Sequence, residues 1–150
     1  MILGAGGAAR AAAVAAKKLG YEVVVASRRD EQADALALVL GVDSMARADV
    51  AASEADLYFN ATPIGARDDD PPAFPAEVLG NRPLVFDSVY RRDGSPTSTI
   101  RAARAAGCPV VEGIRMFAAQ AVRQARLFGV EDATLEEVTR ILAAPSGGRP

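Results

Sequence analysis

The stretch Met1-Ile2-Leu3-Gly4-Ala5-Gly6-Gly7-Ala8-Ala9-Arg10 decides the fold of this 150-residue chain. A short apolar run enters a glycine-rich turn and an alanine-rich helix leaves it, which fits the G-x-G-x-x-G/A template of a dinucleotide pyrophosphate site. Gly4 would permit the tight turn, and Gly6 would let the backbone approach the phosphates. A small residue at Ala8 or Ala9 would let the helix pack close to the sheet. Similar turns also occur in strand–turn–helix units without a ligand. The rest of the chain therefore has to distinguish a dinucleotide site from a plain turn.

Beyond this stretch, strands and helices alternate. The first helix is expected at about 7–19, with Gly20 ending it, and the β-branched run 21–26 predicts a strand buried on both faces. Further strands are expected at 56–60, 84–87 and 109–112, with a short one after Val42, and further helices at about 30–40, 96–106, 114–128 and 135–143. The alternation predicts an α/β fold, a Rossmann-like doubly wound parallel sheet in one domain over residues 1–145. Residues 146–150 are expected to form a disordered tail.

Local signals mark two helix starts and one loop. Ser95 is expected to cap a helix that has Pro96 in its first turn. Thr134 and Glu137 form a capping box before the last helix. The acidic run 68–70 is expected in an exposed loop, as a solvated tip rather than a metal site, because consecutive carboxylates point in different directions.

Composition excludes several classes of function. A net charge of −2 gives no reason to expect a nucleic acid or an anionic membrane as partner. The single cysteine, Cys108, excludes an intramolecular disulfide and fits a cytoplasmic location, and the absence of histidine excludes histidine catalysis and histidine metal ligands. No stretch has the length and apolarity of a transmembrane helix.

In a doubly wound sheet, ligands bind beyond the carboxyl ends of the strands. The Gly4 turn and the segments 27–29, 60–65 and 88–90 would all follow strands and therefore share one edge. In NAD sites the second strand ends in an acidic residue that binds the ribose, whereas NADP sites carry arginine for the 2′-phosphate. Ser27, Arg28 and Arg29 stand there, which predicts NADP as the cofactor; two solvated arginines before a helix are the alternative.

Five motifs occur along the chain in this order: Gly4-Ala5-Gly6-Gly7-Ala8, Ser27-Arg28-Arg29, Asn60-Ala61-Thr62-Pro63-Ile64-Gly65, Asp87-Ser88-Val89-Tyr90 and Gly113-x-x-Met116-x-x-x-Gln120-Ala121. Together they resemble the C-terminal, NADP-binding domain of shikimate dehydrogenase and its quinate/shikimate relatives. The resemblance covers essentially the whole chain.

The resemblance implies a role for each matching position. The segment from Gly4 through Ala5, Gly6 and Gly7 to Ala8 would hold the pyrophosphate, and Ser27, Arg28 and Arg29 would surround the 2′-phosphate. The cofactor groove would be lined by Asn60, Ala61 and Thr62, with Ser88 and Gly113 on the nicotinamide side. Substrate of the shikimate or quinate class would meet Tyr90 and Gln120. The alternatives are a strand-end aromatic for Tyr90 and a surface helix residue for Gln120.

Several positions depart from the family's pattern. Ser27 stands where asparagine is usual, Gln32 replaces a basic residue, and Arg115 replaces a small residue, usually glycine. Arg115 would either recruit an anionic group or obstruct the pocket. The Asn-Pro after the tyrosine is replaced by residues 91–94.

The family's catalytic Lys and Asp come from an N-terminal domain that this sequence does not contain. Lys17 and Lys18 are the only lysines and lie at the far end of the first helix, so no catalytic residue is expected here. Two further hypotheses stay open beside a dehydrogenase half: a catalytically silent NADP-binding or regulatory module that pairs with another chain, and a structural fragment without a ligand. Apolar surface near Met116, Phe117 and Phe128 predicts a homo-oligomer.

Overall fold

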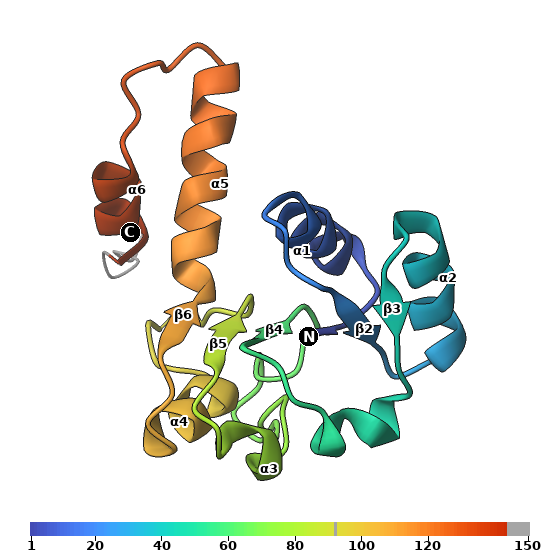
Figure 1. Ribbon diagram of the computed structural model, residues 1–150. Coiled ribbons are helices and arrows are strands. Elements are labelled where there is room, and N and C mark those ends of the chain that lie inside the picture. Colours follow the sequence, from blue (N-terminus) through green and yellow to red (C-terminus); the bar gives the residue numbers. More distant parts are fainter. Residues whose placement is uncertain (92, 144–150) are drawn as a thin grey trace.

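Six parallel strands form one sheet in the order β3-β2-β1-β4-β5-β6 (Figure 1). Their bounds are β1 (Ile2–Leu3), β2 (Val24–Ala26), β3 (Asp43–Ser44), β4 (Leu57–Asn60), β5 (Leu84–Asp87) and β6 (Val110–Glu112). The strand order reverses at β1, because the chain first builds β2 and β3 on one side and then crosses to β4 on the other. This order is that of the dinucleotide-binding fold, so the predicted Rossmann-like α/β architecture is confirmed.

The computed structural model describes residues 1–91 and 93–143, so the tail expected at 146–150 lies outside the described residues. Successive side chains of each strand point to opposite faces of the sheet, so each face presents apolar side chains. Helices cover both faces. One core cluster contains Tyr58 of β4 and Val85 of β5, and the other contains Phe59. The helices α1 (Gly7–Lys18) and α2 (Asp30–Leu40) cover the Phe59 face, while the Tyr58 face is covered by the 3₁₀ helix Arg47–Ala52, α3 (Ala76–Leu79) and α4 (Ser98–Ala105).

The start of α4 differs from the sequence prediction. Its N-cap is Thr97, whose hydroxyl oxygen accepts a hydrogen bond from the Ile100 N–H at 3.2 Å. Ser95 lies in the preceding turn, where its hydroxyl donates to the Asp93 carboxylate at 2.8 Å. The expectation that Ser95 caps this helix is therefore wrong, because the Thr97 hydroxyl accepts the helical N–H and the Ser95 hydroxyl is bonded to Asp93 instead.

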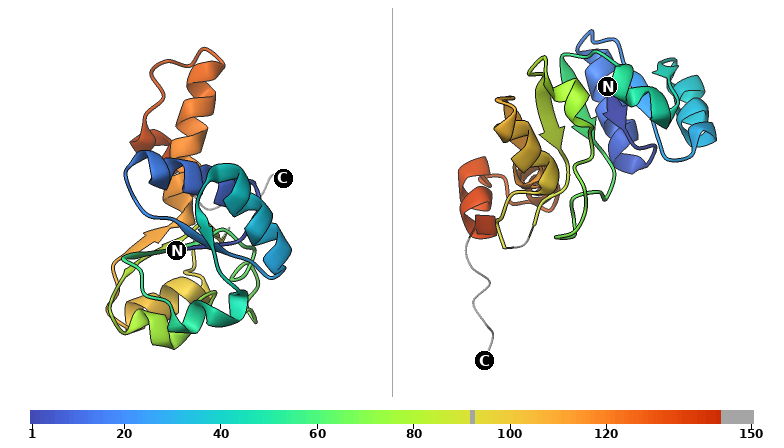
Figure 2. Two further views of the ribbon diagram at one scale, coloured as in Figure 1. Left: turned by 45° about the vertical axis from the view of Figure 1, so that its right-hand side comes forward. Right: turned by 90° about the horizontal axis from the view of Figure 1, so that it is seen from below.

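The last two helices stand away from the sheet as a hairpin. The helix α5 (Gly113–Leu127) leaves β6 and extends beyond the sheet, and α6 (Leu135–Ala143) returns beside it (Figures 1 and 2). The predicted capping box is confirmed: the Thr134 hydroxyl donates to the Glu137 carboxylate at 2.8 Å, and the Glu137 N–H donates back at 3.2 Å. None of the described helices combines the length and apolarity needed to cross a membrane.

Candidate cofactor site

Five strands end at the same level of the sheet. The register aligns Leu3 with Ala26 and Asn60, and Asn60 in turn with Asp87, which is aligned with Glu112. The residue that follows each of these strands is therefore the first one outside the sheet. These five residues are Gly4, Ser27, Ala61, Ser88 and Gly113. All five are residues that the sequence predicted for the site, so the fold brings the predicted motifs to one edge.

In the turn after β1, glycine has one role at Gly4 and another at Gly6 and Gly7. Gly4 has a φ of +120°, and a Cβ at this position would lie 2.8 Å from the Ala61 carbonyl oxygen. Its N–H donates to the Ala26 carbonyl at 2.7 Å, which locks the turn to β2. At Gly6 and Gly7 a Cβ would meet no atom within 4 Å. Gly4 is thus required by packing, whereas Gly6 and Gly7 leave open space where a phosphate could approach.

The N-terminus of α1 is available to an anion. The first intrahelical bond runs from the Arg10 N–H to the Gly6 carbonyl at 3.0 Å, which leaves the first three helical N–H groups without partners inside the helix. Within the described residues no side chain caps this end, and its first turn carries no acidic residue. Of the alanines predicted here, Ala9 is wholly buried against the sheet, Ala5 is half-buried and Ala8 is exposed. This terminus fits a pyrophosphate.

The turn after β2 presents two cations. Arg28 and Arg29 are exposed, and within the described residues neither forms an ion pair. Ser27 is buried, and its hydroxyl donates to the Arg29 carbonyl at 2.5 Å. The serine side chain therefore fixes the shape of the turn from beneath, and the two guanidinium groups are the donors left to meet a phosphate.

At the end of β4, Asn60 is wholly buried and uses its whole amide to shape the next loop. Its Nδ2 group donates to the Ile64 carbonyl at 3.0 Å and to the Asp87 carboxylate at 2.8 Å. Its Oδ1 atom accepts from the Thr62 N–H at 3.0 Å and from the Thr62 hydroxyl at 2.6 Å. Ala61 and Thr62 are half-buried. Asn60 therefore supports the groove from below, and Ala61 and Thr62 form its surface.

Asp87, the last residue of β5, is a buried carboxylate at the centre of these contacts. Its Oδ1 atom also accepts from the Val89 N–H at 3.1 Å, and its Oδ2 atom accepts from the Thr97 hydroxyl at 2.5 Å. Burial raises the pKa of Asp87, and the hydrogen bonds from Thr97, Val89 and Asn60 oppose this rise. Neither Asp87 nor Thr97 was predicted to have a role in the site; the signal available in the sequence was an acidic residue at the end of an apolar strand.

The other end of the site lies between the β5 exit and α5. A Cβ at Gly113 would lie 2.4 Å from the Ser88 carbonyl oxygen, so α5 begins in direct contact with this exit. Tyr90 is 40% exposed and stacks on Phe117 of α5, with ring centroids 5.0 Å apart. Gln120 is exposed and lies one helical turn beyond Phe117. The two predicted substrate residues, Tyr90 and Gln120, therefore lie on the same side of α5, and Ser88, two residues before Tyr90, is half-buried.

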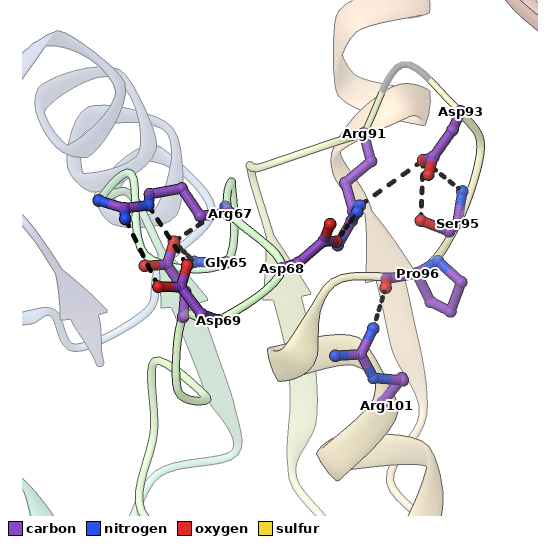
Figure 3. A network of polar contacts seen from close by, with 10 residues as sticks. Gly65, Arg67, Asp68, Asp69, Arg91, Asp93, Ser95, Pro96 and Arg101 are labelled. Carbon is purple, nitrogen blue, oxygen red and sulfur yellow. Dashed lines mark hydrogen bonds and ion pairs between the residues drawn. The ribbon is translucent and has the colours of Figure 1, made fainter.

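Charged residues of two loops form a network next to this end of the site (Figure 3). Arg91, the residue after Tyr90, forms an ion pair with Asp68, so it joins the β5 exit to the loop that follows β4. The other two carboxylates of the acidic run have different partners: Asp69 pairs with Arg67 at 3.3 Å, and Asp70 accepts from the Gly65 and Arg67 N–H groups at 3.0 Å. These backbone hydrogen bonds lower the pKa of Asp70.

Comparison with known proteins agrees with this geometry. A family model described as NADP oxidoreductase, coenzyme F420-dependent, matches residues 1–77, just over half of the 150 residues. The chain belongs to this NADP-binding family. The matched segment contains the Gly4 turn, the Arg28 and Arg29 turn and the Asn60 loop.

Its relatives are shikimate dehydrogenases. The NADP(+) shikimate dehydrogenase of Methanothrix thermoacetophila is 34% identical over 149 residues, which cover 98% of this chain and 54% of that protein. The enzyme of Thermus thermophilus is 37% identical over 147 residues, covering 98% of this chain and 51% of that protein. The chain therefore spans about half the length of these relatives.

Solved structures of related dehydrogenases agree with this relationship. Thermus thermophilus shikimate 5-dehydrogenase in complex with NADP(H) and shikimate superposes with a TM-score of 0.80 at 34% identity, covering 94% of this chain and 54% of that one. Quinate dehydrogenase from Corynebacterium glutamicum in complex with NAD gives 0.81 at 32% identity, covering 93% of this chain and 52% of that one. The predicted resemblance to the NADP-binding domain of shikimate dehydrogenase is confirmed, and NADP is the cofactor of this domain.

Proposed function

We propose that this chain is the NADP-binding half of a shikimate dehydrogenase-like oxidoreductase that transfers hydride between NADPH and 3-dehydroshikimate. The observation that carries the proposal is the row Gly4, Ser27, Ala61, Ser88 and Gly113, which gathers five predicted motifs at the carboxyl edge of one sheet. When bound, NADPH supplies the hydride that reduces the substrate ketone to an alcohol. Residues 1–145 form the domain in this proposal.

The chain's own residues hold and orient the cofactor. The uncapped N-terminus of α1 would receive the pyrophosphate, with Gly6 and Gly7 leaving room for it. Arg28 and Arg29 would bind the 2′-phosphate, because guanidinium groups form paired hydrogen bonds with phosphate oxygens. The half-buried Ala61 and Thr62 would line the groove toward Ser88.

The substrate would be held by Tyr90 and Gln120, whose phenol and amide suit hydroxyl and carboxylate groups. The acid–base pair is proposed to come from residues outside this chain. Lys17 is unsuited to the role, because its Nζ group donates to the Leu40 and Gly41 carbonyls at 2.6 and 3.0 Å, at the far end of α1. We therefore assign no catalytic residue here.

A second candidate function is a catalytically silent NADP-binding or regulatory module that pairs with another chain. The observation that favours it is Arg115, an exposed cation in the first turn of α5. A cation at a helix N-terminus is unfavourable for the helix dipole, and it stands beside the proposed nicotinamide side. Turnover of shikimate or quinate by this chain alone would exclude the silent module.

The first test is a titration of the chain with NADPH and with NADH. We expect NADPH to bind more tightly, and Arg28→Ala and Arg29→Ala each to weaken NADPH binding by about tenfold, which corresponds to about 1.4 kcal/mol. NADH affinity should stay unchanged in both variants, because NADH lacks the 2′-phosphate. Arg123→Ala, which removes an exposed arginine of α5, is the matched control. Equal affinity of the wild type for both nucleotides would contradict the assignment of the arginines.

Location and assembly belong to the same proposal. We place the protein in the cytoplasm, because its single cysteine is free, as is usual in a reducing compartment. The predicted apolar surface is exposed only at Phe128, because Met116 packs against the core and Phe117 stacks on Tyr90. We therefore propose self-association through the end of the α5–α6 hairpin, where Leu127 and Phe128 are each 86% exposed.

A further inference from the structure

We infer that Asp87 is a positioning residue that sets the nicotinamide half of the cofactor groove. It does so by joining the loop after β4, the loop after β5 and the start of α4 through one buried carboxylate. The inference rests on the proposed function and extends it to a residue beneath the groove.

The link to the loop after β4 runs through Asn60. The Asn60 amide donates to Asp87 at 2.8 Å and to the Ile64 carbonyl at 3.0 Å, while its oxygen holds Thr62 through two hydrogen bonds. The end of the same loop packs on the network directly: a Cβ at Gly65 would lie 3.2 Å from the Thr97 Cβ. The path of this loop therefore depends on where Asp87 holds the Asn60 amide.

The link to the other side runs through Val89 and Thr97. The Val89 N–H donates to Asp87 Oδ1 at 3.1 Å and fixes the exit of β5, one residue after Ser88 and one before Tyr90. The Thr97 hydroxyl donates to Asp87 Oδ2 at 2.5 Å while it accepts from the Ile100 N–H. One side chain thus fixes the relative positions of the two loops that would meet the nicotinamide.

The chemistry of the network requires a carboxylate. Three donors converge on Asp87, and an ionised carboxylate has acceptor sites for all of them and carries no proton of its own. An amide at this position would turn an N–H₂ group toward one of the donors. An apolar residue at this position would leave all three donors without an acceptor, so Asp87 also contributes to stability. The test must therefore separate a positioning role from a loss of stability.

The effect should be confined to one half of the cofactor. The Gly4 turn and the Arg28 turn follow β1 and β2, whereas Asp87 ends β5, on the other side of the point where the strand order reverses. The adenosine phosphates would therefore bind away from the Asp87 network, and the nicotinamide would bind above it.

The test compares NADPH with adenosine 2′,5′-bisphosphate, which contains only the adenosine half, in calorimetric titrations of the full chain. For Asp87→Asn we expect NADPH affinity to fall by about tenfold, as for loss of a hydrogen bond to a charged group, and bisphosphate affinity to stay within about twofold. Thr97→Val should show the same selective loss, and Thr97→Ser, which keeps the hydroxyl, should retain wild-type NADPH affinity. Val50→Ala, a change in the buried core of the 3₁₀ helix, controls for lost stability.

Two results would overturn the inference while leaving the proposed function standing. One is wild-type NADPH affinity in Asp87→Asn. The other is an equal loss of affinity for NADPH and for the bisphosphate in Asp87→Asn, with the same loss in Val50→Ala when the two variants have the same melting temperature. A wild-type chain that binds neither nucleotide would instead reject the proposed function, and the inference would be rejected with it.

Discussion

At the scale of single residues, the glycines of the first turn differ in the space around them. Gly4 is confined by the Ala61 carbonyl and by a positive φ, so any side chain there must displace backbone. Gly6 has open space on its Cβ side and an ordinary φ of −83°. The sequence motif assigned the tight turn to Gly4 and the phosphate approach to Gly6, and the structure adds that packing against Ala61 also confines Gly4.

This difference makes a prediction for two alanine variants. Gly4→Ala should lower the free energy of unfolding by about 1–3 kcal/mol, because it adds backbone strain and a steric clash. Gly6→Ala should change it by less than about 1 kcal/mol, yet weaken NADPH binding by about tenfold, because the new methyl group occupies the approach of the pyrophosphate. Urea unfolding and NADPH titration of both variants check this. Gly6→Ala with wild-type affinity would remove Gly6 from the site.

At the scale of elements, one hydroxyl decides where α4 begins. Thr97 caps the helix and also holds Asp87, while Ser95 and Asp93 bond to each other in an exposed turn. Sequence rules identified the right type of residue at the wrong position, since Ser95 followed by Pro96 is an equally good local start signal. The buried acceptor on β5 is what favours Thr97.

Two variants distinguish the caps. Thr97→Ala should reduce the free energy of unfolding by about 1–2 kcal/mol, the usual cost of removing an N-cap. Ser95→Ala should change it by less than about 0.5 kcal/mol, because Ser95 is bonded to an exposed carboxylate in a turn. Thermal or urea unfolding measures both. A larger loss in Ser95→Ala than in Thr97→Ala would contradict the observed helix start.

The capping box of α6 predicts a pH dependence. Hydrogen bonds from the Thr134 hydroxyl and N–H lower the pKa of Glu137, so the ionised carboxylate stabilises α6 above the ordinary pKa of glutamate, about 4.3. This contribution is lost as the pH falls through the lowered pKa. Amide hydrogen exchange of α6 should therefore speed up on acidification beyond its intrinsic pH dependence. Glu137→Gln should remove this extra response, whereas Glu136→Gln, the matched control, should retain it.

At the scale of the whole molecule, the α5–α6 hairpin is the part least covered by the rest of the chain (Figures 1 and 2). Its tip exposes Leu127 and Phe128, each at 86%, and Val130 at 50%. The charges are segregated: every charged residue of α5 is arginine, whereas acidic residues predominate from residue 131 through α6. A two-fold contact between copies would pair the apolar tips and place α5 of one copy against α6 of the other.

We therefore expect the chain to be a homodimer in solution. Light scattering should give twice the mass of one chain, and Phe128→Glu should shift the population to monomer, because it buries a charge in the apolar contact. Leu38→Glu is the control, since Leu38 is 85% exposed on α2, away from the hairpin. A wild-type chain that is monomeric at all concentrations would contradict this contact.

The sequence by itself determined the sheet and the location of the site. Short apolar, β-branched runs and glycine-ended helices are local signals, and parallel strands with helical crossovers allow few topologies, so the edge that gathers the motifs followed directly. The Gly4 turn and the Arg28 turn were predictable because each is built from neighbouring residues. The same holds for the capping box of α6.

Only the tertiary structure decided which polar groups face a ligand and which lie beneath the site. Asn60 and Ser27 were predicted to contact the cofactor, yet the hydrogen bonds of both side chains hold the loops that carry it. Asp87 meets Asn60, Val89 and Thr97 across distances of up to 27 residues in the sequence. No local pattern encodes such a meeting, because the donors converge only once β4, β5 and α4 have packed together and excluded water from the carboxylate.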